Sequence, residues 1–283
     1  GIMRLLPAAG RITGGSIKLE GEELLTLPEA EMRQVRGARI AMIFQEPATS
    51  LNPVLTVGTQ IGEVLDRHCD LRGEAARRRM LELLRQVGIA DPERRLDEYP
   101  FQFSGGMKQR VMIAIALAGE PDLLIADEPT TALDVTVQAQ VLEIMRDLTR
   151  ELGTAIALIS HDMGVIASMC DRVQVMGYGE FVEAGPVDEI FYAPKHGYTQ
   201  MLLDAVPRLD QPDKPGHPVL PPIENWQDRE TLIDVQDVKV HFPIRMSGGL
   251  FGKTKPLKAV NGVSFELKKG ETLGIVGESG CGK

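Results

Sequence analysis

The chain has 283 residues, of which 43% are hydrophobic and 25% are charged, and its formal net charge is −9. This composition is typical of a globular protein with one large domain or two ordinary ones. The acidic balance argues against a dedicated nucleic-acid-binding protein, because such proteins usually carry a surplus of lysine and arginine.

Roughly the first 200 residues alternate strand-like and helix-like segments, which predicts an α/β domain. Strands are expected at residues 16–24, 39–45 and 155–160. Helices are expected at residues 56–68, 73–88, 107–118 and 135–152, with Gly88 capping the second of them. Between the last two helices, DLLIADEP (122–129) is continuously apolar up to its acidic pair, which is typical of a central parallel strand.

The composition changes after this domain. Residues 206–222 contain six prolines in seventeen positions and no periodic apolar pattern, so we interpret 206–230 as a linker. New strand-like segments follow at 231–242, 259–267 and 271–277. We therefore expect a first domain over residues 1–205, with a C-terminal extension from about residue 179, and the start of a second domain over 231–283.

The segment GESGCGK (277–283) follows an apolar strand-like run and fits the phosphate-loop pattern G-x-x-x-x-G-K. In such a loop the glycines let backbone N–H groups turn towards phosphate oxygens, and the lysine ammonium reaches the β and γ phosphates. A chance glycine-rich turn is the alternative. The predicted nucleotide-binding residues here are Gly277, Glu278, Ser279, Gly280, Cys281, Gly282 and Lys283.

Asp127 and Glu128 lie at the end of the predicted central strand. Adjacent carboxylates there suit a division of labour in ATP hydrolysis, in which Asp127 holds Mg²⁺, usually through water, and Glu128 polarises the attacking water. A carboxylate pair that merely ends a strand at the surface is the alternative reading of this motif alone.

Other motifs are weaker when each is taken singly. In FSGGMKQR (103–110), Ser104, Gly105 and Gly106 open a helix and could cradle an anion, although a serine helix cap explains them equally well. His161 follows a strand and could donate a hydrogen bond to a γ-phosphate, or could be a surface residue. Gln45 also ends a strand and could orient water or a metal ion.

Taken in order, Gln45, FSGGM, LLIADEP, TALD (131–134) and SHD (160–162) resemble the motifs that ABC-transporter ATPases carry downstream of their phosphate loop. This resemblance covers essentially the whole chain. It implies an α/β P-loop NTPase domain, with a mixed or parallel core sheet flanked by helices and a helical subdomain that carries the FSGGM signature, plus the first strands of a second such domain. It also implies an ATPase that uses ATP and Mg²⁺. Its catalytic residues would be Glu128, His161 and Gln45, and its metal ligands Asp127 and Gln45.

Residues 44–53 and 179–207 look like the ATPases of dipeptide, oligopeptide, nickel and glutathione importers. Many peptide-importer ATPases carry a cysteine cluster just beyond that extension, whereas RLDQPDKPGHPVLPP (208–222) has no cysteine. This departure argues against an iron–sulfur cluster. It favours the fused form with two ATPase domains that glutathione-importer-like proteins have.

In the family the phosphate loop precedes Gln45, whereas here it follows SHD. We therefore expect the chain to run from just after one phosphate loop to just inside the next loop of a tandem protein. A circularly permuted single domain, 231–283 followed by 1–207, is the alternative, but it would lack the Ser or Thr that binds magnesium.

The resemblance further implies a head-to-tail pair of ATPase domains. Ser104, Gly105, Gly106 and Asp134 would cover the ATP on residues 277–283, and Phe242 would stack on its adenine unless it is simply an apolar strand residue. Gln45, Asp127, Glu128 and His161 would serve the other ATP. Because neither site would be complete, this polypeptide alone is expected to hydrolyse ATP negligibly.

The implied partners are two membrane-spanning permease subunits, indirectly a periplasmic solute-binding protein, and a second ATPase domain in the same full-length chain or in a dimer, without nucleic acid. The implied location is peripheral, on the cytoplasmic face of the inner membrane. No apolar run approaches the ~20 residues of a membrane-spanning helix, and the start has no signal-peptide pattern. A soluble tandem ABC protein acting on ribosomes or DNA, and a non-catalytic scaffold, are the alternatives.

Overall fold

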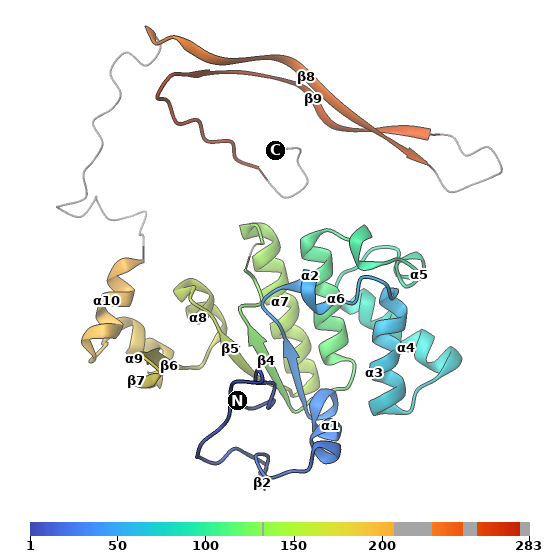
Figure 1. Ribbon diagram of the computed structural model, residues 1–283, viewed down its shortest axis with the longest axis vertical. Coiled ribbons are helices and arrows are strands. Elements are labelled where there is room, and N and C mark those ends of the chain that lie inside the picture. The colour runs from blue at the N-terminus through green and yellow to red at the C-terminus, as the bar shows by residue number, and fades with distance from the viewer. Residues whose placement is uncertain (132, 207–227, 246–253, 278–283) are drawn as a thin grey trace. The chain divides into compact units, whose positions relative to one another are not determined.

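A computed structural model describes residues 1–131, 133–206, 228–245 and 254–277 (Figure 1). The chain divides into two compact units, Gly1–Val206 and Pro207–Lys283. Each unit is considered by itself below.

The first unit is built on a parallel sheet in which β4 (Leu123–Asp127) lies between β3 (Ile40–Ile43) and β5 (Ala155–Ile159). The register pairs Ile43 with Ala126 and Asp127 with Ile159, so the three strands end at the same edge. β4 is buried over its three central residues and is almost wholly apolar, as a strand with neighbours on both sides and a covered sheet should be. The prediction of a central parallel strand is confirmed.

The predicted helices of this unit are confirmed to within two residues. They are α3 (Val57–Cys69), α4 (Gly73–Gln86), α6 (Gly105–Leu117) and α7 (Val135–Leu152). Gly88 has a φ of +70°, and its N–H donates to the Arg85 carbonyl at 2.9 Å while the Ile89 N–H donates to Leu84 at 2.8 Å. This is the left-handed turn with paired hydrogen bonds that ends many helices, and glycine adopts it without strain.

The first unit also contains shorter helices (Figure 1). They are α1 (Glu29–Ala38, with non-helical backbone at Arg36 and Gly37), α2 (Pro47–Ser50), α5 (Pro92–Arg95), the 3₁₀ turn η1 (Pro100–Gln102) and α8 (Met163–Met169).

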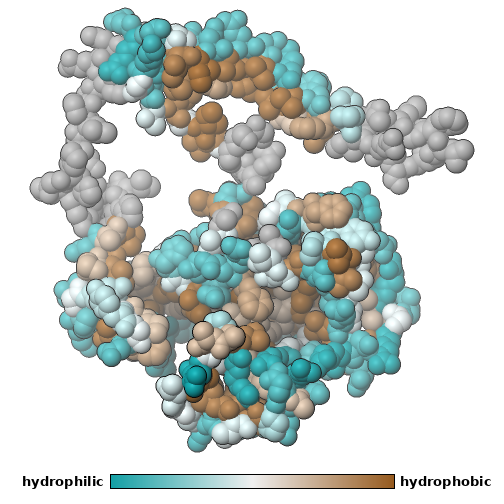
Figure 2. All heavy atoms as spheres, in the orientation of Figure 1, coloured by the Kyte–Doolittle hydropathy of each residue, from teal (hydrophilic) through white to brown (hydrophobic). Residues whose placement is uncertain are grey.

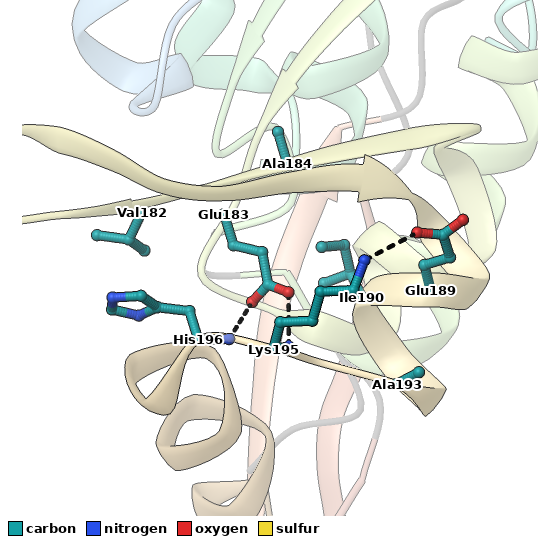
Figure 3. A pocket seen from close by; sticks show the side chains of 8 residues that line it. All are labelled: Val182, Glu183, Ala184, Glu189, Ile190, Ala193, Lys195 and His196. Atoms are coloured by element: carbon teal, nitrogen blue, oxygen red, sulfur yellow. Dashed lines mark hydrogen bonds and ion pairs between the residues drawn. The ribbon is translucent and has the colours of Figure 1, made fainter.

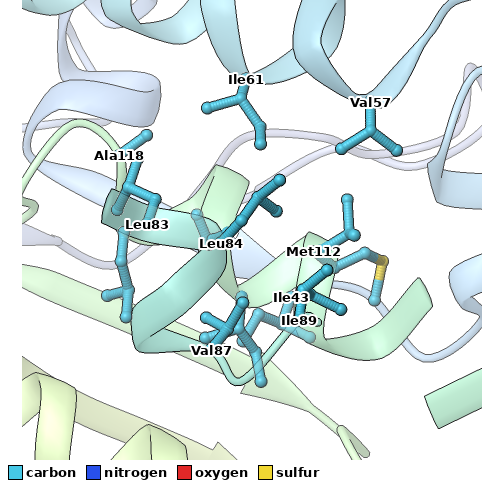
Figure 4. Close-up of a cluster of buried hydrophobic side chains, with 14 of the residues drawn as sticks. Ile43, Val57, Ile61, Leu83, Leu84, Val87, Ile89, Met112 and Ala118 are labelled. Atoms are coloured by element: carbon cyan, nitrogen blue, oxygen red, sulfur yellow. The ribbon is translucent and has the colours of Figure 1, made fainter. Parts of the chain in front are cut away.

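The two faces of the sheet are buried in different clusters. Ala41, Ile43, Leu124 and Ala126 point into a large cluster with side chains of α3, α4, α6 and α7 (Figure 4). Ile40 and Ile125 point the other way, into a smaller cluster with Met32 and Val35 of α1 and with Leu24. Alternate strand residues thus point to opposite faces of the sheet, and both faces are buried. This burial holds the strand ends, and the residues that follow them, in defined positions.

Residues 16–24 were expected to form one strand, and this prediction is wrong. They form a tight hairpin of β1 (Lys18–Leu19) and β2 (Glu22–Glu23). Glu20 and Gly21 between them both have positive φ, at 47° and 90°. A turn with two left-handed central residues reverses the chain, and a glycine in second place favours it.

The C-terminal part of the first unit follows α8. β6 (Arg172–Gly177) and β7 (Glu180–Pro186) form an antiparallel hairpin, and α9 (Val187–Tyr192) and α10 (Gly197–Ala205) come after it. The Glu183 carboxylate accepts hydrogen bonds from the backbone N–H groups of Lys195 at 2.7 Å and His196 at 3.1 Å, which ties the start of α10 to β7.

In the second unit, β8 (Thr231–Arg245) pairs antiparallel with β9 (Thr254–Lys268). This confirms the strands expected near 231–242 and 259–267. The prediction of a strand at 271–277 is wrong. These residues have no regular secondary structure, and no described strand pairs with them. A strand is stable only as part of a ladder, and Ile275 and Val276 are accordingly exposed.

None of the described helices is both long enough and apolar enough to span a lipid bilayer.

Candidate functional site

The backbone of Glu128 has an unusual conformation. Glu128 directly follows the last residue of β4 and has a φ of +46°. Its N–H donates to the Ile159 carbonyl at 2.9 Å, so the residue is fastened to the end of β5. A left-handed conformation costs a residue with a side chain about 1–3 kcal/mol and persists only where its surroundings impose it. Such positions concentrate at functional sites.

Three side chains converge on the carboxylate of Glu128. Gln45 Nε2 donates to Oε2 at 2.7 Å, and the Thr131 hydroxyl donates to the same oxygen at 2.9 Å. His161 Nδ1 lies 3.0 Å from the other oxygen, Oε1. We call Gln45, Glu128, Thr131 and His161 the Glu128 cluster. The sheet register explains their meeting, because they follow β3, β4 and β5, which end at the same edge.

These hydrogen bonds stabilise the ionised form of the Glu128 carboxyl. The hydrogen bond from His161 and next that from Thr131 lower the pKa of the carboxyl, and Gln45 lowers it further, against a partial burial that opposes them. The Glu128 side chain is 23% exposed, whereas that of His161 is 74% exposed. Glu128 is therefore an ionised hydrogen-bond acceptor at neutral pH and can receive a proton.

Asp127 and Gln45 suit a magnesium ion. Asp127 is the last residue of β4, next to Glu128, and the side chain of Gln45, now bonded to Glu128, carries an amide oxygen that can bind a metal ion when the side chain turns. The described residues contain no group of three or more His, Cys, Asp or Glu side chains that could hold a metal ion. Magnesium at nucleotide sites needs no such group, since it uses one or two protein oxygens together with water and phosphate. The residues present thus fit that ion.

Ser104, Gly105, Gly106 and Asp134 form a second group, which we call the α6–α7 start. Ser104 Oγ caps α6 by accepting from the Met107 N–H at 3.3 Å, and Asp134 Oδ1 caps α7 by accepting from the Val137 N–H at 2.9 Å.

The first turns of these two helices are in contact. A Cβ atom on Gly106 would lie 2.5 Å from Val137 Cγ1, so this approach requires glycine, whereas a Cβ on Gly105 would meet nothing within 4 Å. The helix starts thus lie side by side with backbone N–H groups at their ends, an arrangement that favours an anion.

The other predicted site residues lie in the second unit. Phe242 is in β8 opposite Leu257 and is 54% exposed. Gly277 is exposed and has no regular secondary structure. The remaining phosphate-loop residues, Glu278, Ser279, Gly280, Cys281, Gly282 and Lys283, lie outside the described residues.

Neither Thr131 nor Gln138 was predicted from the sequence as a site residue. Gln138 of α7 donates to Asp162 at 3.3 Å, and Asp162 caps α8 by accepting from the Gly164 N–H at 2.8 Å. This contact links α7 to the loop that carries His161. A hydroxyl three residues after Glu128 was the available signal for Thr131, since a turn brings such residues together.

A hollow between β7, α9 and α10 is a weaker candidate site (Figure 3). Its charged side chains are engaged in holding the fold, because Glu183 binds the backbone of Lys195 and His196, and Lys195 Nζ lies 3.9 Å from Glu189. The hollow shows no group of converging side chains comparable to the Glu128 cluster.

Comparison with known proteins identifies two families in this chain. The ABC transporter family matches residues 2–131, and the family described as the C-terminal region of oligopeptide/dipeptide transporters matches residues 182–227. The first match contains Gln45, the α6 signature and the acidic pair, and the second begins within β7.

Curated relatives include transport ATP-binding proteins. The peptidoglycan transport ATP-binding protein YejF of Agrobacterium fabrum is 48% identical over the whole of this chain and 50% of its own length. The glutathione import ATP-binding protein GsiA of Escherichia coli K12 is 48% identical over the whole of this chain and 48% of its own. A putative peptide import ATP-binding protein of Brucella abortus is 47% identical over 90% of this chain and 80% of its own. The chain thus spans about half the length of the first two relatives.

Among solved structures, a dimeric ATP-binding cassette in a post-hydrolysis state, bound to ADP and Pi, is similar to this chain with a TM-score of 0.55. It is 29% identical, and the match covers 62% of this chain and 74% of that one.

Proposed function

The chain belongs to the ABC-transporter ATP-binding proteins of the oligopeptide, dipeptide and glutathione importer family, and we propose that it hydrolyses ATP to energise the uptake of a peptide-class solute. The single observation that carries this proposal is the convergence of Gln45 and His161 on an ionised Glu128 at the common edge of β3, β4 and β5.

Glu128 is the proposed base in this reaction. Its carboxylate receives a proton from the water that attacks the γ-phosphate. His161, largely exposed, turns its imidazole to donate a hydrogen bond to the γ-phosphate. Asp127 and the amide oxygen of Gln45 would hold Mg²⁺, which would neutralise part of the phosphate charge.

The α6–α7 start is proposed to act on a different ATP. In a head-to-tail arrangement, Ser104, Gly105, Gly106 and Asp134 close over the ATP that the phosphate loop 277–283 holds, and Phe242 stacks on its adenine. The contact between the first turns of α6 and α7 and the exposure of Phe242 support this reading. The similar cassette is described as dimeric with ADP and Pi bound, which also supports it.

We propose residues 231–283 as the first strands of a second ATPase domain, joined to the first domain of residues 1–205 by the linker 206–230. Apolar side chains are exposed along β8 and β9, among them Leu232, Ile233, Val238, Val240 and Phe242 (Figure 2). A lone hairpin is marginally stable in water, so such a surface is suited to being covered by further elements of a domain.

The proposed partners are two permease subunits in the membrane, with a solute-binding protein delivering the solute, which places the chain peripherally on the cytoplasmic face. Val54, just before α3, and Phe101, in η1, are exposed at 75% and 71%. Backbone hydrogen bonds from Val57 to Glu98 and from Gly58 to Leu96 tie the start of α3 to the segment just before η1. A membrane partner that pressed on this surface would act on the segment that follows Gln45.

Replacing the proposed base tests this function. In the assembled transporter, Glu128→Gln should lower ATP hydrolysis at least ~100-fold, because the amide cannot take up the proton, while ATP binding is kept. Glu143→Gln, on the exposed face of α7, is the matched control and should leave turnover unchanged. Turnover at the unmodified level in Glu128→Gln would refute the proposal.

A further inference from the structure

The three hydrogen-bond partners of Glu128 are not equivalent. Under the proposed function, on which this inference rests, Gln45 turns its amide oxygen to a cation and His161 turns to the γ-phosphate. Both side chains then leave the carboxylate, to which they are bonded at 2.7 and 3.0 Å. Only Thr131 has no competing task.

Thr131 is also bound to Glu128 in a way that survives such a change. Its hydroxyl donates to Glu128 Oε2 at 2.9 Å, and its backbone N–H donates to the Glu128 carbonyl at 3.1 Å. Both bonds lie within one turn of the chain, so Thr131 and Glu128 move together. Gln45 and His161, in contrast, reach the carboxylate from the loops after β3 and β5.

We propose that Thr131 is a positioning residue that holds Oε2 of Glu128 in place after Gln45 and His161 have turned to the nucleotide. The carboxylate then cannot rotate freely, and Oε1, which His161 vacates, is the oxygen that faces the attacking water.

The chemical step follows from this arrangement. The water oxygen forms a bond to the γ-phosphorus, the bond from that phosphorus to the bridging oxygen breaks with its electron pair going to ADP, and the water proton passes to Oε1. Thr131 acts through Glu128 and touches none of the reacting atoms.

Thr131 is exposed, so its hydroxyl can be removed without disturbing the core. Thr131→Val keeps the side-chain shape and removes the donor, and Thr131→Ser keeps the donor. Thr26→Val makes the same change at an exposed position that precedes α1 and belongs to neither proposed site, and it is the matched control.

In the assembled transporter, Thr131→Val should lower kcat for ATP hydrolysis ~10-fold or more with KM for ATP changed by less than ~2-fold, because a misplaced base slows the chemical step and leaves binding intact. Thr131→Ser should restore kcat to within ~3-fold of the unmodified protein, and Thr26→Val should not change it. Equal kcat in Thr131→Val and the unmodified protein would overturn the proposal, as would an equal loss in Thr131→Ser.

Glu128→Gln separates the failure of this inference from failure of the proposed function. If Glu128→Gln retains turnover, Glu128 is not the base and both proposals fall. If Glu128→Gln abolishes turnover while Thr131→Val does not reduce it, the proposed function stands and Thr131 has no positioning role.

Discussion

Gly106 has no room for a side chain. Its Cβ position lies 2.5 Å from Val137 Cγ1, and valine cannot swing aside easily because its branch point is stiff in a helix. Gly106→Ala should therefore destabilise the chain by about 1–3 kcal/mol, the usual cost of overpacking. Denaturant unfolding measures this change.

Two further variants identify the contact responsible. Gly105→Ala, at a position with open space, should leave the free energy of unfolding nearly unchanged. Adding Val137→Ala to Gly106→Ala should recover part of the lost stability, since the clashing methyl is gone. An unchanged midpoint in Gly106→Ala would show that the α6 and α7 starts can separate at no cost.

At the residue scale, the sequence singled out side chains that meet in the structure, but it did not predict the backbone geometry at that point. The order of motifs identified Gln45, Glu128 and His161, and the strand register explains why they meet. The donation from Thr131 had a local signal that was not used, whereas the left-handed backbone of Glu128 was not predictable. That conformation is fastened by a hydrogen bond to Ile159 of β5, a contact that local sequence does not encode.

At the scale of the elements, the attachment of the start of α10 to β7 depends on the carboxylate of Glu183. The buried Thr199 hydroxyl, and then the N–H groups of Lys195 and His196, lower the pKa of Glu183 below its ordinary value of 4.5. A carboxyl with a lowered folded-state pKa stabilises the fold above its unfolded pKa, and this contribution is lost as the pH falls through the folded-state pKa. The link between β7 and α10 should thus weaken below about pH 4.5.

Glu183→Gln should weaken that link at neutral pH and remove its pH dependence. Unfolding followed from pH 7 to pH 3, together with proteolysis at residues 193–196, measures both effects. The charged neighbours Lys195 and Glu189 are the confounding groups, and Glu189→Gln is the control because its ion pair at 3.9 Å is exposed. A stability profile in Glu183→Gln that still falls with acid, as in the unmodified chain, would contradict the assignment.

Predictions of secondary structure were wrong where a segment becomes a strand only if another segment pairs with it. The helices of the first unit were predictable because their apolar spacing and caps are local. Residues 16–24 and 271–277 are equally strand-like, yet the first segment folds back on itself and the second has no described partner.

For the whole molecule, the head-to-tail proposal makes a chemical prediction. It brings Ser104 of the signature close to Cys281 of the phosphate loop, so a cysteine placed at Ser104 should form a disulfide with Cys281 under mild oxidation. Electrophoresis without reductant would detect it as a faster-moving chain if the two sites belong to one copy, or as a dimer if they belong to two.

Native thiols provide the controls for this experiment. Cys281→Ser in the same background should abolish the cross-link, whereas Cys69 and Cys170 are partly buried and should not replace it. Cross-linking that persists without Cys281, or that never forms with ATP present, would argue against the head-to-tail arrangement.

The hydrogen bonds to Glu128 also affect the reactivity of its carboxylate before ATP binds. A carboxylate whose two oxygens are both engaged by Gln45, Thr131 and His161 has little capacity to draw a proton from a stray water molecule. Under the proposed function, the side chains that bind ATP and its cation are therefore the same ones that occupy the base, and ATP binding itself would free Glu128 for catalysis.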